Sequence, residues 1–313
     1  MNISVAMACY NGEGKILSQL NSLKEQTRKI DEVILIDDHS TDSTPNIIWR
    51  FIAENRLQGW NLTINETNTG WKSCFFQAMT ATTGDLVFLC DQDDEWDPYK
   101  VERMAEIMDT EPQISVLACD YLIYYEPGSI QMRKYKKNKA EKAKPIGQHQ
   151  FTSRFFMNPS PGCTYAVRKQ LIQQTAPSWF PEAPHDEFLW LLATLTGGAW
   201  FLNEYLMTIH RYGDNASDIR FKDIPKQQEN LRYIQRMLDI MLDYAMQNRE
   251  KAGDTRISLI LEAQTWCKKR ARLMETRNPL QWFAMFRYWK YYNSFRNCLS
   301  DLYLVLFGSF RRL

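Results

Sequence analysis

The 313-residue sequence predicts an α/β fold of the nucleotide-binding type, with a mostly parallel sheet flanked by helices and a C-terminal helical extension. Two observations indicate the sheet: apolar runs alternate with amphipathic stretches, and polar residues follow the apolar runs. A third observation, helical periodicity from about Pro225 onward, indicates the extension. Alternating elements of this kind are typical of βαβ units, whose strands are parallel.

The individual elements follow from apolar periodicity. Strands are expected at residues 3–9, 33–36, 62–64, 86–89, 115–124, 163–167 and 199–209, and a helix at 188–195. We expect residues 1–217 to form one domain in two parts, at 1–125 and 151–217. Residues 225–313 are expected to form the helical extension.

Composition excludes little. The 38 Lys and Arg residues nearly balance the 37 Asp and Glu residues, so net charge gives no argument for nucleic-acid binding. The seven cysteines are scattered without C-x-x-C spacing, which favours reduced thiols in a cytoplasmic protein. The sequence contains no run of 18 apolar residues, so we expect a protein that is neither secreted nor membrane-spanning.

The turn after the first predicted strand, Tyr10-Asn11-Gly12-Glu13-Gly14, permits a rival interpretation. A glycine-rich turn with an acid roughly twenty residues later is how dinucleotide-binding folds hold pyrophosphate and ribose. Here Leu17 stands where the third glycine of that motif is needed. A nucleotide-dependent oxidoreductase is therefore the less favoured alternative.

Five acids fall within the seven residues 91–97, shortly after the fourth predicted strand, namely Asp91, Asp93, Asp94, Glu95 and Asp97. Carboxylates at this density repel one another unless a cation or hydrogen-bond donors lie among them. A hard divalent ion takes oxygen ligands and usually shares them with phosphate, so the pattern favours a metal-bound diphosphate. The alternative is an acidic helix N-terminus, where the macrodipole favours Asp and Glu.

Several motifs together resemble glycosyltransferase family 2, and most of all its bacterial polysaccharide rhamnosyltransferases. They are Ala8-x-Tyr10-Asn11-Gly12, Asp37-Asp38-x-Ser40-x-Asp42-x-Thr44, Asn68-x-Gly70, Asp91-Gln92-Asp93-Asp94-x-Trp96-x-Pro98-x-Lys100, Pro161-Gly162-Cys163-Thr164 and His185-Asp186-x-Phe188. Each motif alone is weak, but their order and spacing make a chance match improbable. The resemblance covers about residues 1–217 and implies that they form a catalytic domain, with a nucleotide-sugar-binding half at 1–125 and an acceptor and catalytic-base half at 151–217.

The resemblance implies a GT-A fold and an inverting, metal-dependent transfer, with rhamnose from dTDP-rhamnose as the expected donor. It places the nucleotide-sugar at Ala8, Tyr10, Asn11, Asp38, Asn68, Gly70, Asp91 and Gln92. It further implies Mn²⁺ or Mg²⁺ at Asp93 and a general base at Asp186, with Asp94 a less certain ligand. The implied acceptor is a saccharide or lipid-linked saccharide in surface polysaccharide synthesis. A catalytically inactive sugar-nucleotide-binding protein remains an alternative, as does a helix-capping role for Asp186.

Three features leave their roles open. Tyr212 stands where such enzymes often carry a metal-site histidine, and His210 lies two residues earlier. Residues 133–144 contain seven basic residues and one acid, which is typical of a solvated loop or of an acceptor lid. Residues 282–310 contain eleven aromatic residues interleaved with basic ones, which suits either peripheral contact with the inner face of a membrane or a packed helical cap.

Overall fold

The computed structural model describes residues 1–126, 145–156, 160–212, 221–292 and 294–311. The basic segment 133–144 lies outside these residues. The chain divides into two compact units. Unit 1 contains residues 1–149, 159–193 and 198–214, and unit 2 contains residues 150–158, 194–197 and 215–313. The division into a catalytic domain at 1–217 and an extension at 225–313 stays a prediction.

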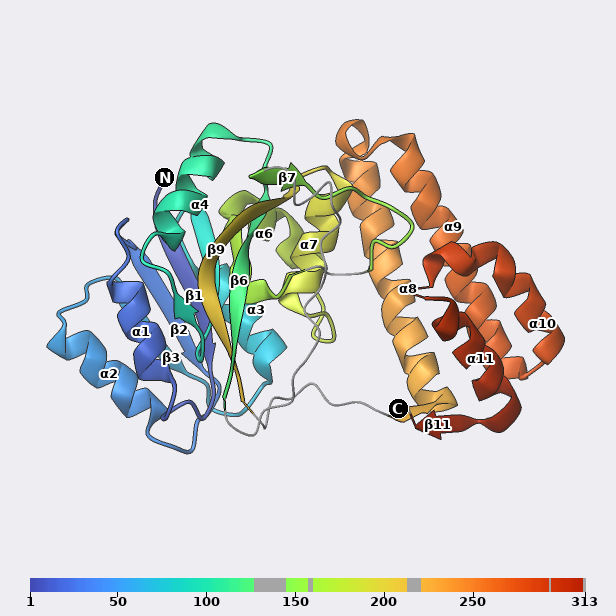
Figure 1. The fold of residues 1–313 in the computed structure, drawn as a ribbon, viewed down its shortest axis with the longest axis horizontal. Helices are drawn as coiled ribbons and strands as arrows, with labels where there is room; N and C mark the ends of the chain where they lie inside the picture. The colour runs from blue at the N-terminus through green and yellow to red at the C-terminus, as the bar shows by residue number, and fades with distance from the viewer. Residues whose placement is uncertain (127–144, 157–159, 213–220, 293, 312–313) are drawn as a thin grey trace. The chain divides into compact units, whose positions relative to one another are not determined.

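Unit 1 is built on one sheet, whose strands lie in the order β3-β2-β1-β4-β8-β6-β9-β5, with β7 also pairing with β9 (Figure 1). The strands are β1 (Ile3–Cys9), β2 (Glu32–Asp37), β3 (Trp60–Ile64), β4 (Leu86–Asp91), β5 (Glu95–Trp96), β6 (Val116–Tyr125), β7 (Ile146–Gln148), β8 (Tyr165–Arg168) and β9 (Ala199–Arg211).

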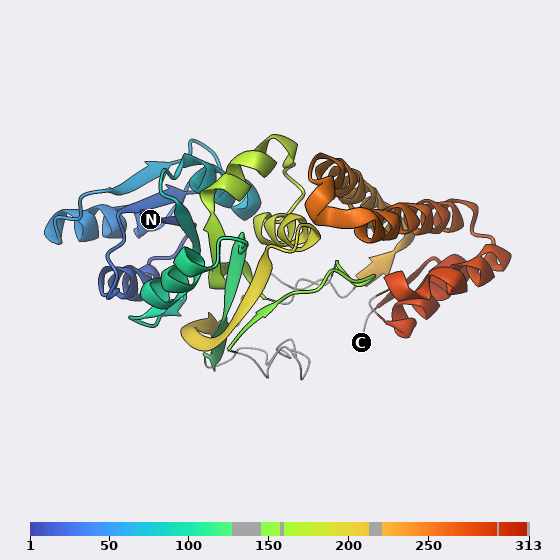
Figure 2. The same cartoon turned by 90° about the horizontal axis from the view of Figure 1, so that it is seen from above.

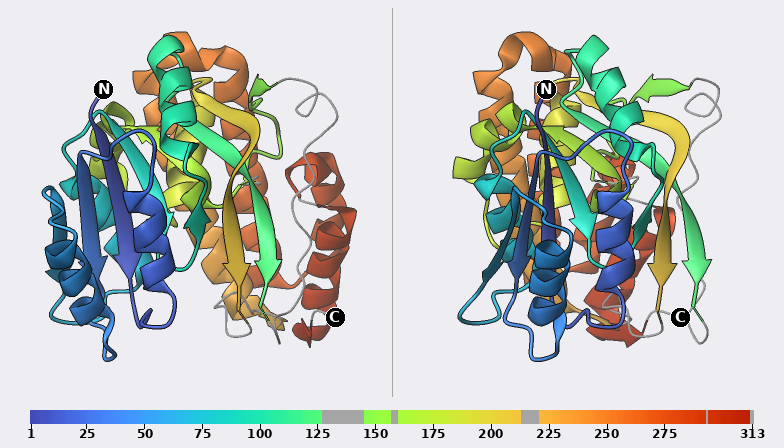
Figure 3. Two further views of the ribbon diagram at one scale, coloured as in Figure 1. Left: turned by 60° about the vertical axis from the view of Figure 1, so that its left-hand side comes forward. Right: turned by 90° about the vertical axis from the view of Figure 1, so that its left-hand side faces the viewer.

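The pairing is parallel in the first half of the sheet and mixed in the second. Strand β1 pairs in parallel with β2 and β4, and β2 with β3. The long strands β6 and β9 are also parallel and lie side by side (Figure 3). However, β8 runs antiparallel between β4 and β6, and β5 and β7 run antiparallel to β9. The start of β8 therefore lies beside the end of β4.

Helices cover both faces of this sheet (Figure 2). They are α1 (Ile16–Lys24), α2 (Thr44–Glu54), α3 (Trp71–Ala81), α4 (Lys100–Thr110), α6 (Lys169–Thr175) and α7 (His185–Leu195), with short 3₁₀ turns η1 (Gly162–Thr164) and η2 (Ala176–Ser178). Alternate residues of β1, such as Val5 and Met7, share one buried cluster with apolar residues of α1, α2 and α4. Helix α3 packs against β1 and β2. The strand ends are thereby held by two packed layers.

Unit 2 confirms the predicted C-terminal helices. It contains α8 (Ile224–Gln247), α9 (Arg249–Thr276), α10 (Pro279–Phe283), the 3₁₀ helix η3 (Ala284–Tyr291) and α11 (Phe295–Phe307), with β10 (Phe221–Asp223) antiparallel to β11 (Ser309–Arg311). A fully enclosed ion pair joins α9 to α11: the guanidinium of Arg270 donates to both carboxylate oxygens of Asp301, at 2.6 and 2.8 Å. Tyr292 donates to the same carboxylate at 2.7 Å.

The cysteines and the helices test two further expectations. All seven cysteines are buried free thiols. Among the described residues, no helix combines the length and the apolar character that crossing a bilayer requires.

Candidate active site

The loops at the carboxyl ends of β1 and β2 are joined by hydrogen bonds. Ser40 Oγ accepts the N–H of Asn11 at 2.9 Å, and Asn11 Oδ1 accepts the N–H of Thr41 at 2.9 Å. Thr44 Oγ1 accepts the N–H of Gly12 at 2.7 Å. Because Thr44 is the first residue of α2, its hydroxyl fixes the loop after β1 instead of capping its own helix. This arrangement presets the backbone of the loop where the sequence places a nucleotide.

Gln92 connects the loop after β4 to the loop after β1. Its Nε2 donates to the carbonyl of Tyr10 at 2.8 Å, and its Oε1 accepts the N–H of Tyr10 at 3.0 Å. A Cβ on Gly12 would lie 2.5 Å from Gln92 Oε1, so a larger residue there would displace the Gln92 amide. The amide of Gln92, predicted to contact the nucleotide-sugar, is thus already engaged with the protein backbone.

Asp38 lies at the end of β2 and organises the loop that contains Asn68 and Gly70. Its carboxylate is only 2% exposed and accepts the N–H groups of Thr69 and Gly70, each at 2.8 Å. Asn65 Nδ2 and the Thr69 hydroxyl also donate to it. Burial acts to raise the pKa of Asp38, but these hydrogen bonds outweigh it and lower the pKa. The loop that contains Asn68 and Gly70, both predicted to bind the nucleotide-sugar, is therefore fixed by one ionised carboxylate.

The carboxylates after β4 are crowded. One potential ligand atom from each of Asp91, Asp94 and Cys163 lies within 4.8 Å of the others. Asp94 is 3% exposed, and its Oδ2 has no hydrogen-bond partner among the described residues. Burial, followed by the neighbouring Asp94 and Asp93 carboxylates, raises the pKa of Asp91, and burial raises the pKa of Asp94 to about 6. Carboxylates crowded in this way fit a site for a divalent ion, which prefers oxygen ligands.

Asp93, the predicted metal ligand, lies outside that three-residue group. It is half-buried, and burial raises its pKa, while the charges of Lys15, Arg211 and His210 act to lower it. Asp93 thus has three positive or basic side chains nearby. Its role at a metal stays a prediction.

Cys163 and Lys100 support the acidic loop, and sequence reasoning assigned neither of them a role. Cys163 follows Gly162 in η1, and its thiol is hydrogen-bonded to Asp91 and Asp94. Lys100 is fully buried, donates to the carbonyl of Cys163 at 2.8 Å and lies 3.8 Å from the ring centroid of Trp96. The sequence signal that could have indicated a role for Lys100 is its position two residues after Pro98, in a motif otherwise rich in acids.

Asp186, the predicted base, is the second residue of α7 and faces this cluster. Its carboxylate is close enough to act on the pKa of Asp91. A Cβ on Gly162 would lie 2.8 Å from Asp186 Cβ and 3.0 Å from His185 Nε2, so glycine is what permits α7 to approach η1. Asp186 Oδ1 also accepts the N–H of Glu187 at 2.8 Å. Because α7 already begins at His185, Asp186 does not hold the N-cap position.

His185 positions the start of α7. Its ring stacks on Phe75, with centroids 4.1 Å apart, and is almost completely buried. Burial lowers the pKa of His185, although the charge of Asp186 acts to raise it. Neither ring nitrogen has a hydrogen-bond partner among the described residues. The neutral ring therefore acts as a packing element beside the predicted base.

His210 and Tyr212 lie on the opposite rim of the acidic loop. His210 Nδ1 is 3.1 Å from Glu126 Oε1, and its Nε2 is 3.8 Å from Glu95 Oε2. The ring of Tyr212 lies under Lys15 Nζ, 3.7 Å from the ring centroid. The backbone N–H of His210 is hydrogen-bonded to Asp94. Both side chains thus border the candidate site, without either being assigned to a metal.

The predicted site residues gather at one edge of the sheet. Ala8 is paired in register with Asp91, so the ends of β1 and β4 meet. The structure brings together the following predicted residues: Ala8, Tyr10, Asn11 and Gln92 at the first strand ends, Asp38, Asn68 and Gly70 at the next, and Asp91, Asp93 and Asp186 at the acidic loop. Their individual roles stay predictions. The geometry suits a bound diphosphate with a carboxylate base nearby.

Comparisons with known proteins agree on the fold. The structure of Staphylococcus aureus TarS 1–349 in complex with UDP-GlcNAc matches with a TM-score of 0.61 and 17% identity, over 97% of this chain and 81% of TarS. The mannosyltransferase PcManGT from Pyrobaculum calidifontis, in complex with GDP-Man and Mn²⁺, matches with a TM-score of 0.55 and 14% identity, over 97% of this chain and 85% of PcManGT. At such identities the likeness concerns the fold alone, which is the expected GT-A fold.

Sequence relatives complete the comparison. The dTDP-rhamnosyl transferase RfbG of Shigella flexneri is 25% identical over 229 residues, which is 69% of this chain and 75% of RfbG. In four other bacterial relatives, which are 30% or 32% identical, the aligned segment spans only 36% or 37% of the relative's length. The model of the family "Glycosyl transferase family 2" matches residues 4–169, more than half of the chain. The chain therefore belongs to glycosyl transferase family 2.

Proposed function

We propose that this protein transfers a sugar from a nucleoside diphosphate sugar to a saccharide or lipid-linked acceptor, with inversion at the anomeric carbon. The observation that carries the proposal is the meeting of Asp91, Asp93 and Asp186 at the strand ends, beside preset loops that can receive a nucleotide. In open α/β sheets, ligands bind at the carboxyl ends of the strands.

A divalent ion, Mn²⁺ or Mg²⁺, belongs to this proposal. Asp91 and Asp93 are the residues that would hold it, because both are more accessible than the enclosed Asp94. When bound there, the ion neutralises charge on the departing diphosphate. Lys15 and Arg211, which lie near Asp93, would add positive charge on the same side. The catalytic residue is Asp186, which would take the proton from the acceptor hydroxyl.

Inversion follows from the assignment of a single carboxylate as base. Without a second carboxylate acting as nucleophile, the acceptor oxygen attacks the anomeric carbon directly as the bond to the diphosphate breaks. The proton passes from the acceptor hydroxyl to Asp186, and the nucleoside diphosphate leaves with the bonding electron pair. One displacement reverses the configuration at that carbon.

Rhamnose from dTDP-rhamnose is the proposed donor, and a growing surface polysaccharide the proposed acceptor. The similarity to RfbG, a dTDP-rhamnosyl transferase, supports the donor. The amylovoran biosynthesis glycosyltransferase AmsB of Erwinia amylovora, 28% identical over 48% of this chain, supports polysaccharide synthesis. We place the reaction in the cytoplasm, at the inner face of the membrane where a lipid-linked acceptor would be available.

The test is a screen for slow donor hydrolysis with dTDP-rhamnose, UDP-GlcNAc and GDP-mannose, with Mn²⁺ and with a chelator. We expect Mn²⁺-dependent release of nucleoside diphosphate from one donor, fastest for dTDP-rhamnose. Hydrolysis that survives chelation would overturn the metal assignment. If NAD raises the melting temperature and no nucleotide-sugar does, the result would favour the oxidoreductase. If a nucleotide-sugar raises the melting temperature but is neither hydrolysed nor transferred to any acceptor, the result would favour an inactive binding protein.

A further inference from the structure

Unit 2 presents an apolar surface that its own core does not cover, formed by one side of α10, η3 and α11. We propose that this surface, defined by Leu280, Phe283, Phe286, Trp289, Phe295, Leu299, Tyr303, Leu306 and Phe307, inserts into the headgroup region of a bilayer containing anionic lipid. The proposed contact is peripheral, because no helix among the described residues is long and apolar enough to span a bilayer.

Helices α10 and η3 supply the first stripe through a strict three-residue spacing. Leu280, Phe283, Phe286 and Trp289 are all exposed, with Leu280 at 73% and Phe283 at 63%. The residues that occur two places later in each repeat are buried, namely Trp282, Met285, Tyr288 and Tyr291. Side chains at i and i+3 eclipse in a 3₁₀ helix, so the spacing separates an inner aromatic face from an outer one. The four side chains of the outer face remain exposed among the described residues of unit 2.

Helix α11 supplies the second stripe. Phe295, Leu299, Tyr303, Leu306 and Phe307 are exposed, whereas Cys298, Asp301, Leu304 and Val305 are buried on the opposite side. The exposed positions repeat at intervals of three and four residues, as one face of an α-helix requires. A helix with apolar residues on both sides needs a second apolar environment beyond the core it already packs on.

The two stripes form one continuous surface. The rings of Phe283 and Phe286 lie 6.4 Å apart, and those of Phe286 and Phe295 lie 6.3 Å apart, measured between centroids. At the far end of α11, the rings of Tyr303 and Phe307 are 4.6 Å apart. The inner side of the same helices is already fixed by the buried Arg270–Asp301 pair. The exposed apolar residues of α10, η3 and α11 are therefore separate from the core that these helices already share.

Charge selects an anionic membrane as the occupant. Residues 277–313 contain six Lys and Arg residues and one acid, Asp301, which is buried in its pair with Arg270. Arg277, Arg287 and Arg296 are exposed. A surface of apolar and aromatic side chains with exposed arginines nearby matches the headgroup region of a bilayer with anionic lipids.

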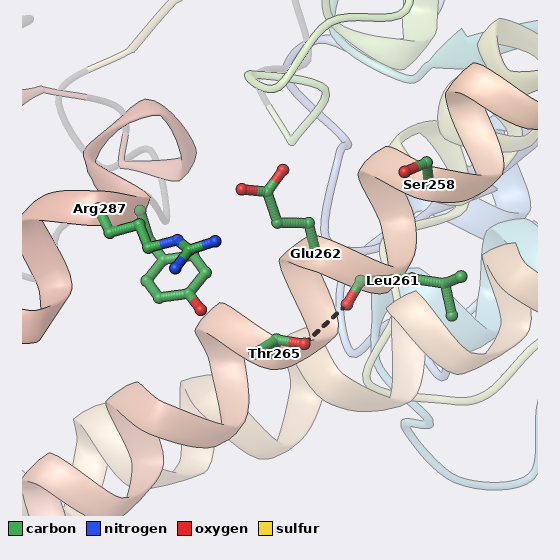
Figure 4. A pocket seen from close by; sticks show the side chains of 6 residues that line it. Ser258, Leu261, Glu262, Thr265 and Arg287 are labelled. Carbon is green, nitrogen blue, oxygen red and sulfur yellow. Dashed lines mark hydrogen bonds between the residues drawn. The ribbon is translucent and has the colours of Figure 1, made fainter.

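A polar pocket in the same unit, lined by Ser258, Leu261, Glu262, Thr265, Arg287 and Tyr288, is a poorer candidate for lipid contact (Figure 4). The carboxylate of Glu262 lies in it and accepts from Lys290 Nζ at 2.7 Å and from the Tyr291 hydroxyl at 2.8 Å. A negative charge in the pocket repels a lipid phosphate. Lys290 is engaged there, so the membrane-facing charge rests mainly on the exposed arginines.

The experiment measures co-sedimentation of the full chain with vesicles of equal parts phosphatidylglycerol and phosphatidylcholine, and with phosphatidylcholine alone. We expect the parent to bind the anionic vesicles, less so as salt rises. Combined Phe283→Gln, Trp289→Gln and Phe307→Gln substitutions should lower the partition coefficient roughly 10- to 100-fold, because each removes a large apolar contact. Arg287→Gln with Arg296→Gln should remove most of the preference for anionic lipid.

The matched control replaces equally exposed apolar residues elsewhere, Leu17→Gln, Trp49→Gln and Met246→Gln, and should bind as the parent does. Unchanged binding of the Phe283/Trp289/Phe307 variant would overturn the proposal. The proposal would also fail if the parent were a dimer and this variant a monomer, since the surface would then join two copies. It would fail as well if the variant had a clearly lower melting temperature than the parent, since the surface would then be packed within the chain. Donor hydrolysis does not involve these residues, so failure here would leave the proposed function standing.

Discussion

The acids after β2 and the acids after β4 occur at the same edge of one sheet, yet their surroundings are opposite. Asp37 and Asp38 are matched by donors: Ser40 alone gives Asp37 two hydrogen bonds, at 2.6 and 2.8 Å. Asp91 and Asp94 face other carboxylates, and Asp94 Oδ2 has no partner among the described residues. Asp37 and Asp38 therefore stabilise the ligand-free fold. Asp91 and Asp94 repel each other and the neighbouring carboxylates, and a cation would reduce that repulsion.

The direction of the pKa shift expresses the same difference. Donated hydrogen bonds lower the pKa of Asp38 in spite of its burial, while burial raises the pKa of Asp94 to about 6. Aspartate side chains thus stabilise a preformed loop after β2 and form a candidate binding site after β4. Replacing Asp by the nearly isosteric Asn should separate these roles.

The largest effect is expected at Asp186, which belongs to neither group and faces the second. Asp186→Asn should reduce turnover roughly 10²- to 10⁴-fold, because Asn cannot take the acceptor proton. Its melting temperature and donor affinity should match those of the parent, since Asn keeps an acceptor oxygen for the N–H of Glu187. Steady-state kinetics and calorimetry measure these quantities.

Glu187→Gln is the control for Asp186→Asn, because Glu187 is the adjacent carboxylate in the same helix turn. It should retain most of the transfer rate. If the Asp186 variant remains active and the Glu187 variant does not, the base is Glu187. If the Asp186 variant loses stability instead, its carboxylate has a structural role.

The next effect concerns the ion. Asp93→Asn should weaken Mn²⁺-dependent binding of the nucleoside diphosphate by roughly 10- to 100-fold, a loss that even residues supporting metal ligands produce. Binding without metal should change little. Isothermal titration with and without Mn²⁺ compares this variant with Asp94→Asn, for which we expect a milder loss. If Asp94→Asn has the larger effect, the ion lies within the group of Asp91, Asp94 and Cys163.

Much of the fold could be predicted because its signals are local. The apolar run at 3–9 predicted β1 with its observed bounds, and helical periodicity predicted α7, although three residues short at its start. The direction of β8 could not be predicted, since it depends on which distant strands it pairs with. The strand predicted at 163–167 begins at Tyr165, because Gly162–Thr164 forms a 3₁₀ turn.

The candidate site was predictable as a set of residues but not as a set of contacts. Motif spacing placed Asp38, Asp93 and Asp186 at strand and helix ends. It could not show that Asp38 is saturated by the 65–70 loop or that the Cys163 thiol lies beside Asp94, 69 positions earlier in the chain. Such contacts depend on tertiary packing. A single sequence indicates that packing only at isolated positions, such as Gly162, where the absence of a side chain permits a close approach.

A third prediction tests the donor-matched acids. Asp38→Asn should lower the free energy of unfolding at pH 7 by about 2 kcal/mol, because Asn keeps one acceptor oxygen and presents an N–H group to backbone donors. Since the folded pKa of Asp38 is lowered, this stabilisation is present at neutral pH and is lost as pH falls below about 4. Urea unfolding at pH 7 measures it. An unchanged midpoint would mean that the loop does not depend on this charge.

The smallest effect, and the one of opposite sign, is expected at Asp94. Its folded pKa is raised to about 6, so its neutral form favours folding below about pH 4, and this contribution is lost as pH rises through about 6. Asp94→Asn should therefore match the parent near pH 4.5 and exceed its unfolding free energy at pH 7.5, by on the order of 1–2 kcal/mol, when no metal is added. Saturating Mn²⁺ with nucleotide should reduce this difference in unfolding free energy, because the ion offsets the same repulsion in the parent.

Urea unfolding at both pH values, with a chelator and with Mn²⁺, measures the difference between Asp94→Asn and the parent. If Asp94→Asn is less stable than the parent at pH 7.5, Asp94 belongs with Asp38 among the donor-matched acids, and the repulsion after β4 arises from Asp91 and Asp93 alone.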